Sequence, residues 1–199
     1  VNFTDSESRI MKTKDGFQQC YNAQAGVETD SRLIVGARVT QAPNDKEQLE
    51  PTLAAVREHL APAHVLVDSG FVSEAVIRSV EQARPDGPAE RPRVLAGVIR
   101  ERHGRTVEQL EKREDPPAPP PDAPFAERLA HRTATAAGRA LYRLRQQTVE
   151  PVFGIIKSVL GFRRFLMRGL AKASLEWDLV CLAYNMKRLH RLGARLQAA

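Results

Sequence analysis

A proline-rich stretch divides the sequence into parts of different character. Six of the thirteen prolines lie between residues 116 and 124, inside a charged region that runs from residue 100 to residue 130. Proline lacks a backbone N–H and favours an extended polyproline II conformation, so this density argues against regular helix or sheet. The sequence therefore predicts three segments: a β-rich part at 1–99, a linker or exposed insertion at 100–130, and a helical part at 131–199.

The first segment alternates between strand and helix patterns. Period-2 alternation and short apolar runs indicate strands, whereas apolar residues at threes and fours indicate helices. The predicted elements are, in order, a hairpin of 17–27 and 33–39, a helix over 46–60 capped by Asn44-Asp45, a strand at 64–67, a helix over 74–83 and a strand at 93–99. Lone strands that follow helices favour a mixed α/β sheet.

Two long helices are predicted in the last segment, over 133–160 and over 170–192, because apolar residues recur there at threes and fours. Pro151 must either bend the first helix or lie in the first turn of a new one capped near Thr148. The buried stripe of the second helix is predicted to consist of Leu175, Leu179, Leu182 and Met186.

Basic residues are concentrated in the last third of the chain. Residues 131–199 carry thirteen Lys and Arg against three Asp and Glu, whereas residues 1–130 carry seventeen against twenty-one. Such a segment is typical of a protein that binds a polyanion, most often nucleic acid, and it is equally typical of a solvated helical face.

Composition excludes several other classes. With only Cys20 and Cys181, the chain cannot form a disulfide scaffold or a four-cysteine zinc site. No apolar run reaches the roughly 18–20 residues of a membrane span, and the first residues lack the pattern of a signal peptide. These features predict a soluble, cytoplasmic protein without a membrane partner.

Two carboxylates, those of Asp68 and Glu150, lie at positions that suit a catalytic or metal-binding role. Asp68 follows the apolar run 64–67, at the carboxyl end of a predicted strand, where open α/β sheets bind ligands. Glu150 lies between apolar residues, which would allow its side chain to be held inward, and Lys157 falls two turns later on the same helical face. Carboxylates with a nearby ammonium suit metal-dependent phosphoryl transfer, but a turn cap and a surface ion pair are the more ordinary interpretation.

Several stretches of the chain resemble the catalytic domain of DDE transposases from bacterial insertion sequences. They are Thr4-Asp-Ser-Glu-Ser-Arg-Ile-Met-Lys12, Tyr21-Asn-Ala-Gln24, Val39-Thr40 with Asn44-Asp45, Asp68-Ser-Gly-Phe71, Thr148-Val-Glu-Pro-Val-Phe-Gly154, Phe162-Arg-Arg-Phe165 and Leu182-Ala-Tyr-Asn185. In the family signature, a tyrosine and an arginine precede the catalytic glutamate and a lysine follows it. Tyr142, Arg145 and Lys157 match these types around Glu150, although Arg145 is one residue further from Glu150 than usual.

The resemblance implies an α/β fold with an RNase H-like mixed sheet flanked by helices. It also implies cleavage and transfer of DNA strands with Mg²⁺ or Mn²⁺, in which Asp68 matches the second metal-binding acid and Glu150 the third. The residues expected to contact DNA are Tyr142, Arg145, Lys157, Arg163 and Arg164. The implied partner is double-stranded DNA, as transposon ends and target, at the bacterial nucleoid. A homodimer is compatible with this resemblance.

The first metal-binding acid of the family has no counterpart in the sequence. Asp5, Asp15 and Asp30 do not end a predicted buried strand, and the family's first strand would lie upstream of Thr4. We therefore expect residues 1–99 to be a truncated RNase H-like core without its central first strand, and the chain alone to be inactive. A non-catalytic DNA-binding remnant of a transposase is the alternative function. A nuclease of another RNase H-like kind, which cuts without joining, is a third.

Overall fold

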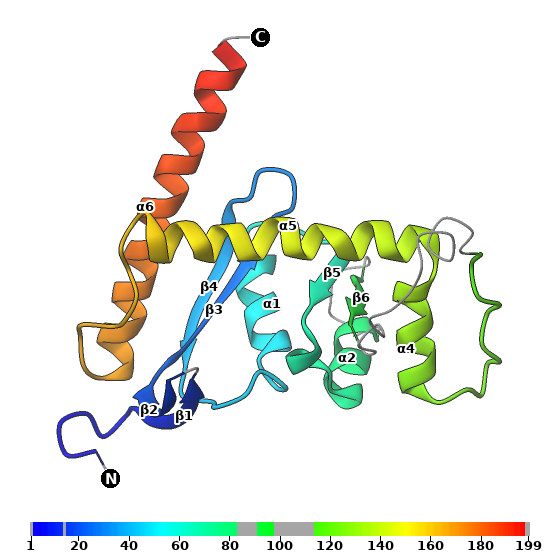
Figure 1. Ribbon diagram of the computed structural model, residues 1–199, viewed down its shortest axis with the longest axis horizontal. Helices are drawn as coiled ribbons and strands as arrows, with labels where there is room; N and C mark the ends of the chain where they lie inside the picture. Colours follow the sequence, from blue (N-terminus) through cyan, green and yellow to red (C-terminus); the bar gives the residue numbers. More distant parts are fainter. Residues whose placement is uncertain (1, 14, 83–90, 98–113, 198–199) are drawn as a thin grey trace. The chain divides into compact units, whose positions relative to one another are not determined.

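The computed structural model describes residues 2–13, 15–82, 91–97 and 114–197, with side chains up to residue 193 (Figure 1). The chain forms two compact units. The first comprises residues 1–61 and 147–199, and the second comprises residues 62–146. One helix, α5 (Ala136–Ser158), belongs to the second unit up to residue 146 and to the first unit from residue 147.

In the first unit, two antiparallel strand pairs follow one another along the chain. β1 (Arg9–Thr13) pairs with β2 (Gly16–Cys20), and β3 (Asn22–Val27) pairs with β4 (Ile34–Thr40). The predicted hairpin is therefore confirmed for β3 and β4, while residues 17–20 instead belong to β2. The strand β1 was not predicted, because its two large apolar residues, Ile10 and Met11, are adjacent and do not alternate with polar residues.

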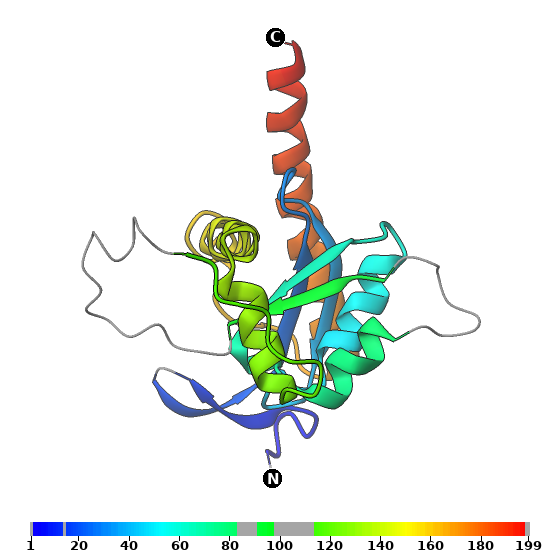
Figure 2. The same cartoon turned by 90° about the vertical axis from the view of Figure 1, so that its right-hand side faces the viewer.

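The β3–β4 hairpin is covered on both faces. Apolar residues of one face, including Ala23 and Ala25, pack against the cluster formed with α6 (Leu170–Gln197). The other face meets Val56 of α1 (Leu49–Arg57), and Figures 1 and 2 show this helix beside the hairpin. A Cβ atom added at Gly36 would lie 2.7 Å from Val56 Cγ2, so the close approach of helix and hairpin requires glycine there.

The core of the first unit corrects the predicted stripe of α6. The residues that α6 and α5 bury are Val152, Ile156, Ala173, Trp177, Cys181 and Tyr184. The predicted stripe of Leu175, Leu179, Leu182 and Met186 is instead more than half exposed. Apolar residues lie on both faces of this helix, and the face that bears Trp177 and Tyr184 packs on the hairpin side, where both side chains donate hydrogen bonds to backbone carbonyls.

The second unit is built on a parallel strand pair. β5 (His64–Val67) pairs with β6 (Arg93–Ala96), from His64 opposite Arg93 to Val67 opposite Ala96. The helices α2 (Glu74–Glu81) and α4 (Phe125–Ala134) pack against β6. The side chains that fill the space between strands and helices are Val67, Ile77, Val80, Val94, Leu95 and Leu129.

Several boundaries differ from the predicted ones. Helix α4 begins at Phe125, inside the predicted linker, because Leu129 is an apolar anchor that is fully buried. Helix α5 continues through Pro151, so no second helix begins there. The helix α1 begins only at Leu49, since the Asp45 side chain is bonded elsewhere and does not cap it. Residues 98–113 of the predicted strand and linker lie outside the described residues.

The mixed α/β class predicted from the sequence is confirmed. The described strands form three two-stranded sheets, β1–β2, β3–β4 and β5–β6. The RNase H-like arrangement of the sheet, the missing first strand and the three-segment division remain predictions.

Candidate active site

Asp68 follows the last residue of β5, at the carboxyl end of the parallel pair. Its backbone is extended, and its Oδ1 accepts a hydrogen bond from the backbone N–H of Ser69 at 2.7 Å, which caps a short 3₁₀ turn, η1 (Ser69–Phe71). The side chain nevertheless remains 61% exposed. The position therefore confirms a strand-end carboxylate that is fixed by a turn and still open to a ligand.

Two predicted site residues from α5 meet Asp68 in the second unit. The Nη1 atom of Arg145 lies 3.9 Å from Asp68 Oδ2, and the Tyr142 hydroxyl donates to the carbonyl oxygen of Val67 at 3.0 Å. The Arg145 guanidinium also lies over the Tyr142 ring, 5.7 Å from its centroid. We refer to Asp68, Tyr142 and Arg145 as the Asp68 cluster. The unusual spacing of Arg145 in the sequence does not prevent it from reaching this carboxylate.

The end of β6 makes room for the tyrosine of this cluster. A Cβ atom at Gly97 would lie only 2.7 Å from the Tyr142 hydroxyl oxygen. Glycine at this position therefore lets the hydroxyl reach the end of β5. Sequence analysis did not single out Gly97, because the residue that crowds it is distant in the sequence.

Glu150 and Lys157 lie in the part of α5 that belongs to the first unit. Both residues are exposed, so the inward orientation predicted for Glu150 from its apolar neighbours is wrong. Of those neighbours only Val152, on the other side of the helix, is fully buried. The Lys157 ammonium lies 5.8 Å from the centroid of the Phe153 ring. Within the described ranges, no group of three or more His, Cys, Asp or Glu side chains is arranged to hold a metal ion.

Arg163 and Arg164 lie on the exposed loop between α5 and α6. The aromatic residues on either side of them anchor this loop, since the rings of Phe162 and Phe165 are in edge contact at 5.4 Å between centroids. Phe165 also meets Tyr21, and Phe162 meets Trp177. The two guanidinium groups are therefore carried by a loop with a fixed apolar base, which suits contact with a phosphate backbone.

Other residues of the matching stretches hold the first unit together. The Asp45 Oδ1 atom accepts hydrogen bonds from the side-chain amides of Asn22 at 2.8 Å and Gln24 at 2.7 Å. The amide of Asn185 bonds both backbone groups of Ile34, and the Tyr184 hydroxyl donates to the carbonyl of Arg32. Sequence analysis assigned Asp45 to a helix cap and gave the other residues no structural role, and their spacing along the chain carries no signal of these long-range pairs.

The N-terminal stretch is tied to the same unit by two carboxylates. The Tyr21 hydroxyl donates to both carboxylate oxygens of Asp5, at 2.8 and 2.9 Å. Burial and this carboxylate raise the pKa of Tyr21 to about 12. Burial opposes ionisation of Asp5, but the hydrogen bonds from Tyr21 and the backbone outweigh it and lower the Asp5 pKa. Glu7 Oε2 accepts from the backbone N–H of Leu170 at the start of α6.

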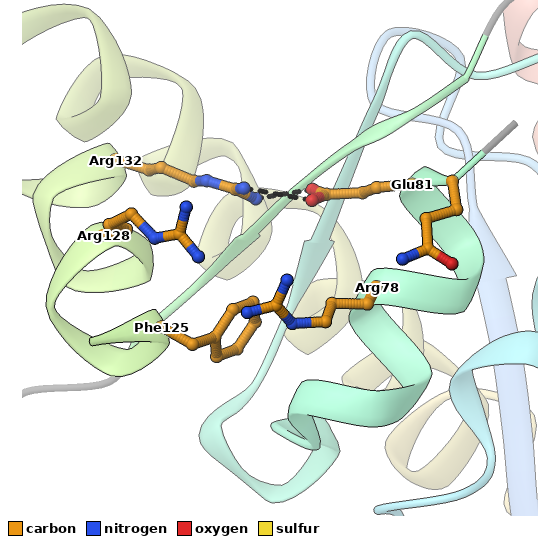
Figure 3. Close-up of a pocket in the computed structure, with 6 residues that line it drawn as sticks. Arg78, Glu81, Phe125, Arg128 and Arg132 are labelled. Carbon is orange, nitrogen blue, oxygen red and sulfur yellow. Dashed lines mark hydrogen bonds and ion pairs between the residues drawn. The ribbon is translucent and has the colours of Figure 1, made fainter. Parts of the chain in front are cut away.

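A pocket of about 200 Å³ in the second unit lies between α2 and α4 (Figure 3). The residues that line it are Arg78, Glu81, Gln82, Phe125, Arg128 and Arg132, so no residue predicted as a site residue contributes. Figure 3 shows Arg132 and Glu81 pointing toward one another, and their ion pair has contacts of 2.5 and 3.0 Å. Arg132 also donates to the carbonyl oxygen of Val94, so this pair ties α4 to α2 and β6.

Comparison with known proteins gives one match. The model of the family described as "Transposase DDE domain" matches residues 3–186. No curated protein and no solved structure matches the chain. In the part of the chain that the structure describes, no helix is long and apolar enough to cross a membrane.

Proposed function

The chain belongs to the transposase DDE domain family, and we propose that it acts in metal-dependent cleavage and transfer of DNA strands during transposition. The substrate class is double-stranded DNA, as transposon ends and target. The observation that carries this proposal is the Asp68 cluster. An exposed carboxylate lies at the carboxyl end of a parallel strand pair, beside an arginine from the helix that also bears Glu150.

Asp68 and Glu150 are the proposed metal ligands. Both offer exposed carboxylate oxygens, and oxygen donors are what Mg²⁺ and Mn²⁺ prefer, usually together with water and substrate phosphate. The donor set therefore fits the metal that the family implies. A metal held there would lower the pKa of an attacking hydroxyl and stabilise the leaving oxygen of a phosphodiester.

The remaining residues would position DNA. Arg145 already contacts a carboxylate oxygen, and its planar guanidinium suits phosphate equally well. Tyr142 holds Arg145 by its ring and the end of β5 by its hydroxyl. Lys157, Arg163 and Arg164 are exposed cations that would contact the phosphate backbone and so orient the duplex without reading its sequence.

Nicking of supercoiled plasmid tests the metal site. The assay uses the chain extended at its N-terminus by an aspartate-bearing strand, as the family resemblance requires, and compares it with the chain alone. Nicking should need Mg²⁺ or Mn²⁺ and should fall at least about 100-fold in Asp68→Asn and in Glu150→Gln. Glu127→Gln and Asp178→Asn remove an exposed acid from each unit and should leave nicking unchanged. Nicking that persists in either site variant would contradict the assignment.

Exposed cations of the first unit favour a second candidate, a DNA-binding protein that does not cut. In that case DNA binding would fall steeply with salt and would be weakened by Arg163→Gln and Arg164→Gln. It would not respond to Asp68→Asn or to added metal, and no preparation would nick DNA. Binding measured by fluorescence anisotropy alongside the nicking assay therefore separates the two candidates.

A further inference from the structure

The pocket between α2 and α4 in the second unit carries an excess of positive charge. We refer to it as the α2–α4 pocket. Its lining contains three guanidinium groups and one carboxylate, together with one amide and one phenyl ring; these belong to Arg78, Arg128, Arg132, Glu81, Gln82 and Phe125. No residue proposed to bind metal or DNA lies in this lining, so a ligand here would be additional to the proposed metal site.

Two of the three arginines are already paired with carboxylates. Arg132 donates to both carboxylate oxygens of Glu81, and both partners are largely buried. Arg78 pairs with Glu74 at 2.7 Å and lies over the Phe125 ring, 5.4 Å from its centroid. The Arg78–Glu74 pair is about half exposed, and such surface pairs are weak, so Arg78 can turn to a ligand at little cost.

Arg128 has no such partner in the described part of the chain. Its Nε atom is buried, and no described residue accepts a hydrogen bond from it. Figure 3 shows the Arg128 guanidinium pointing from α4 into the α2–α4 pocket. A buried donor without an acceptor destabilises a fold, and the effect is larger when the donor is charged. An anion bound in the pocket would accept from this guanidinium and compensate its charge.

The size of the pocket and the origin of its donors favour a phosphate group. A volume of about 200 Å³ lies below the roughly 300–1,000 Å³ of pockets for organic ligands, and far above the about 10–15 Å³ that one water needs. The available donors come from two helices, from Arg78 on α2 and from Arg128 on α4. A planar carboxylate suits the fork of one guanidinium, whereas the tetrahedral oxygens of phosphate accept from several directions at once.

We propose that the α2–α4 pocket binds a phosphate group, with Arg128 as the principal donor and Arg78 as the second. The Arg132–Glu81 pair holds α2 and α4 together and so forms the wall of the site, while the Phe125 ring supports Arg78. The phosphate is either inorganic phosphate or a small ester, or a phosphodiester of duplex DNA. The second source rests on the proposed function.

Phosphorus NMR of inorganic phosphate tests the site without DNA or metal. The phosphate line should broaden when the full chain is added. Sulfate, which is also tetrahedral, should reverse the broadening, whereas acetate at the same ionic strength should not. Arg128→Gln should abolish the broadening, and Arg93→Gln, which changes an exposed arginine of the same unit outside the pocket, should keep it. Broadening that persists in Arg128→Gln, or that acetate reverses equally well, would overturn the proposal.

Thermal unfolding tests the argument from burial. In phosphate-free buffer, Arg128→Met should unfold at the same temperature as the parent chain or at a higher one, because it removes the unpartnered N–H and keeps an aliphatic side chain. Added phosphate should stabilise the parent chain more than this variant. A midpoint several degrees below that of the parent would mean that the fold itself satisfies the guanidinium, and would overturn the proposal.

The salt dependence of DNA binding identifies the source of the phosphate. If the pocket takes a phosphodiester, Arg128→Gln should reduce the slope of log K against log salt by about 0.9, the value for one phosphate contact, and Arg93→Gln should not. An unchanged slope with a lost phosphorus response identifies inorganic phosphate or a small ester. No broadening and no change of slope would overturn the proposal. A parent chain that binds no duplex DNA would instead contradict the proposed function, and the phosphorus spectrum would still decide the pocket.

Discussion

The hydroxyl of Tyr21 and the carboxylate of Asp5 form a pair whose proton is held on the tyrosine. Burial disfavours the phenolate, and the adjacent negative charge adds to that effect, so the Tyr21 pKa rises to about 12 from an ordinary value of 10.0. The same hydrogen bond favours the ionised form of Asp5 and lowers its pKa below 3.8. At the residue scale, this pair links the first matching stretch of the chain to the start of β3.

The stability contributed by this pair depends on pH in two windows. The Tyr21 contribution is fully present below pH 10 and is lost as the pH rises toward about 12, because the unfolded state ionises first. The Asp5 contribution is present above its ordinary pKa of 3.8 and is lost as the pH falls through the lowered folded pKa. Both windows lie far from neutrality, so the pair is intact under physiological conditions.

Ultraviolet titration of the three tyrosines tests the raised pKa predicted for Tyr21. The transition of highest pKa, near 12, should disappear in Tyr21→Phe. In Asp5→Asn that transition should move toward the ordinary value of 10.0, because the carboxylate is gone. Asp15→Asn removes an exposed acid from the β1–β2 turn and should leave the transition in place. A Tyr21 transition that does not respond to Asp5→Asn would contradict the account.

At the scale of single elements, one side chain of α6 bonds the backbone of the β3–β4 hairpin in the way a neighbouring strand would. Asn185 accepts from the Ile34 N–H at 2.9 Å and donates to the Ile34 carbonyl at 2.8 Å. One amide side chain therefore satisfies both backbone groups of the first residue of β4. The family stretch Leu182-Ala-Tyr-Asn185 thus fastens the last helix to the hairpin, a structural role that we did not assign from the sequence.

Asn185→Ala should destabilise the chain by about 1–2 kcal/mol, because it removes two hydrogen bonds and leaves two backbone groups of β4 without partners. Urea unfolding followed by circular dichroism measures this change. Asn44→Ala removes one exposed bond to the Lys46 N–H and should change the free energy of unfolding by less than about 0.5 kcal/mol. Equal effects of the two substitutions would mean that the Asn185 amide does not hold β4.

Some elements of the two units could be predicted from the sequence, and others could not. β5, α2 and the β3–β4 hairpin follow from local patterns, because their apolar spacing has only one interpretation. The buried face of α6 does not, since both of its faces are apolar and only the position of the hairpin selects Trp177 over Leu179. Helix α4 was likewise not predicted from local propensity, because prolines precede it directly; its buried residue is Leu129.

The residues of the candidate site could be predicted from the sequence, but the contacts between them could not. Asp68 could be recognised by its place after a strand, and the matching family stretches identified the α5 residues. The 3.9 Å contact of Arg145 with Asp68 and the bond of Tyr142 to the end of β5 depend on tertiary structure. Spacing in the sequence even argued against Arg145, because a position one residue away lies on a different side of a helix.

At the scale of the whole molecule, the family match extends over both compact units, from residue 3 to residue 186. Helix α5 carries four of the proposed site residues: Tyr142 and Arg145 in its second-unit part, and Glu150 and Lys157 in its first-unit part. The proposed function requires that Asp68 and Glu150 bind the same metal ion. The central claim is therefore that these two carboxylates share a metal.

Iron-directed cleavage of the chain tests this claim without requiring any reaction on DNA. Fe²⁺ takes the place of Mg²⁺ at oxygen sites, and with ascorbate and peroxide it cuts the backbone beside its ligands. We predict two cuts, near residue 68 and near residue 150, both suppressed by excess Mg²⁺. Asp68→Asn and Glu150→Gln should each abolish both cuts, whereas Glu127→Gln and Asp178→Asn should abolish neither. Cutting at one position that ignores substitution at the other, or no cutting at either, would contradict a shared metal site.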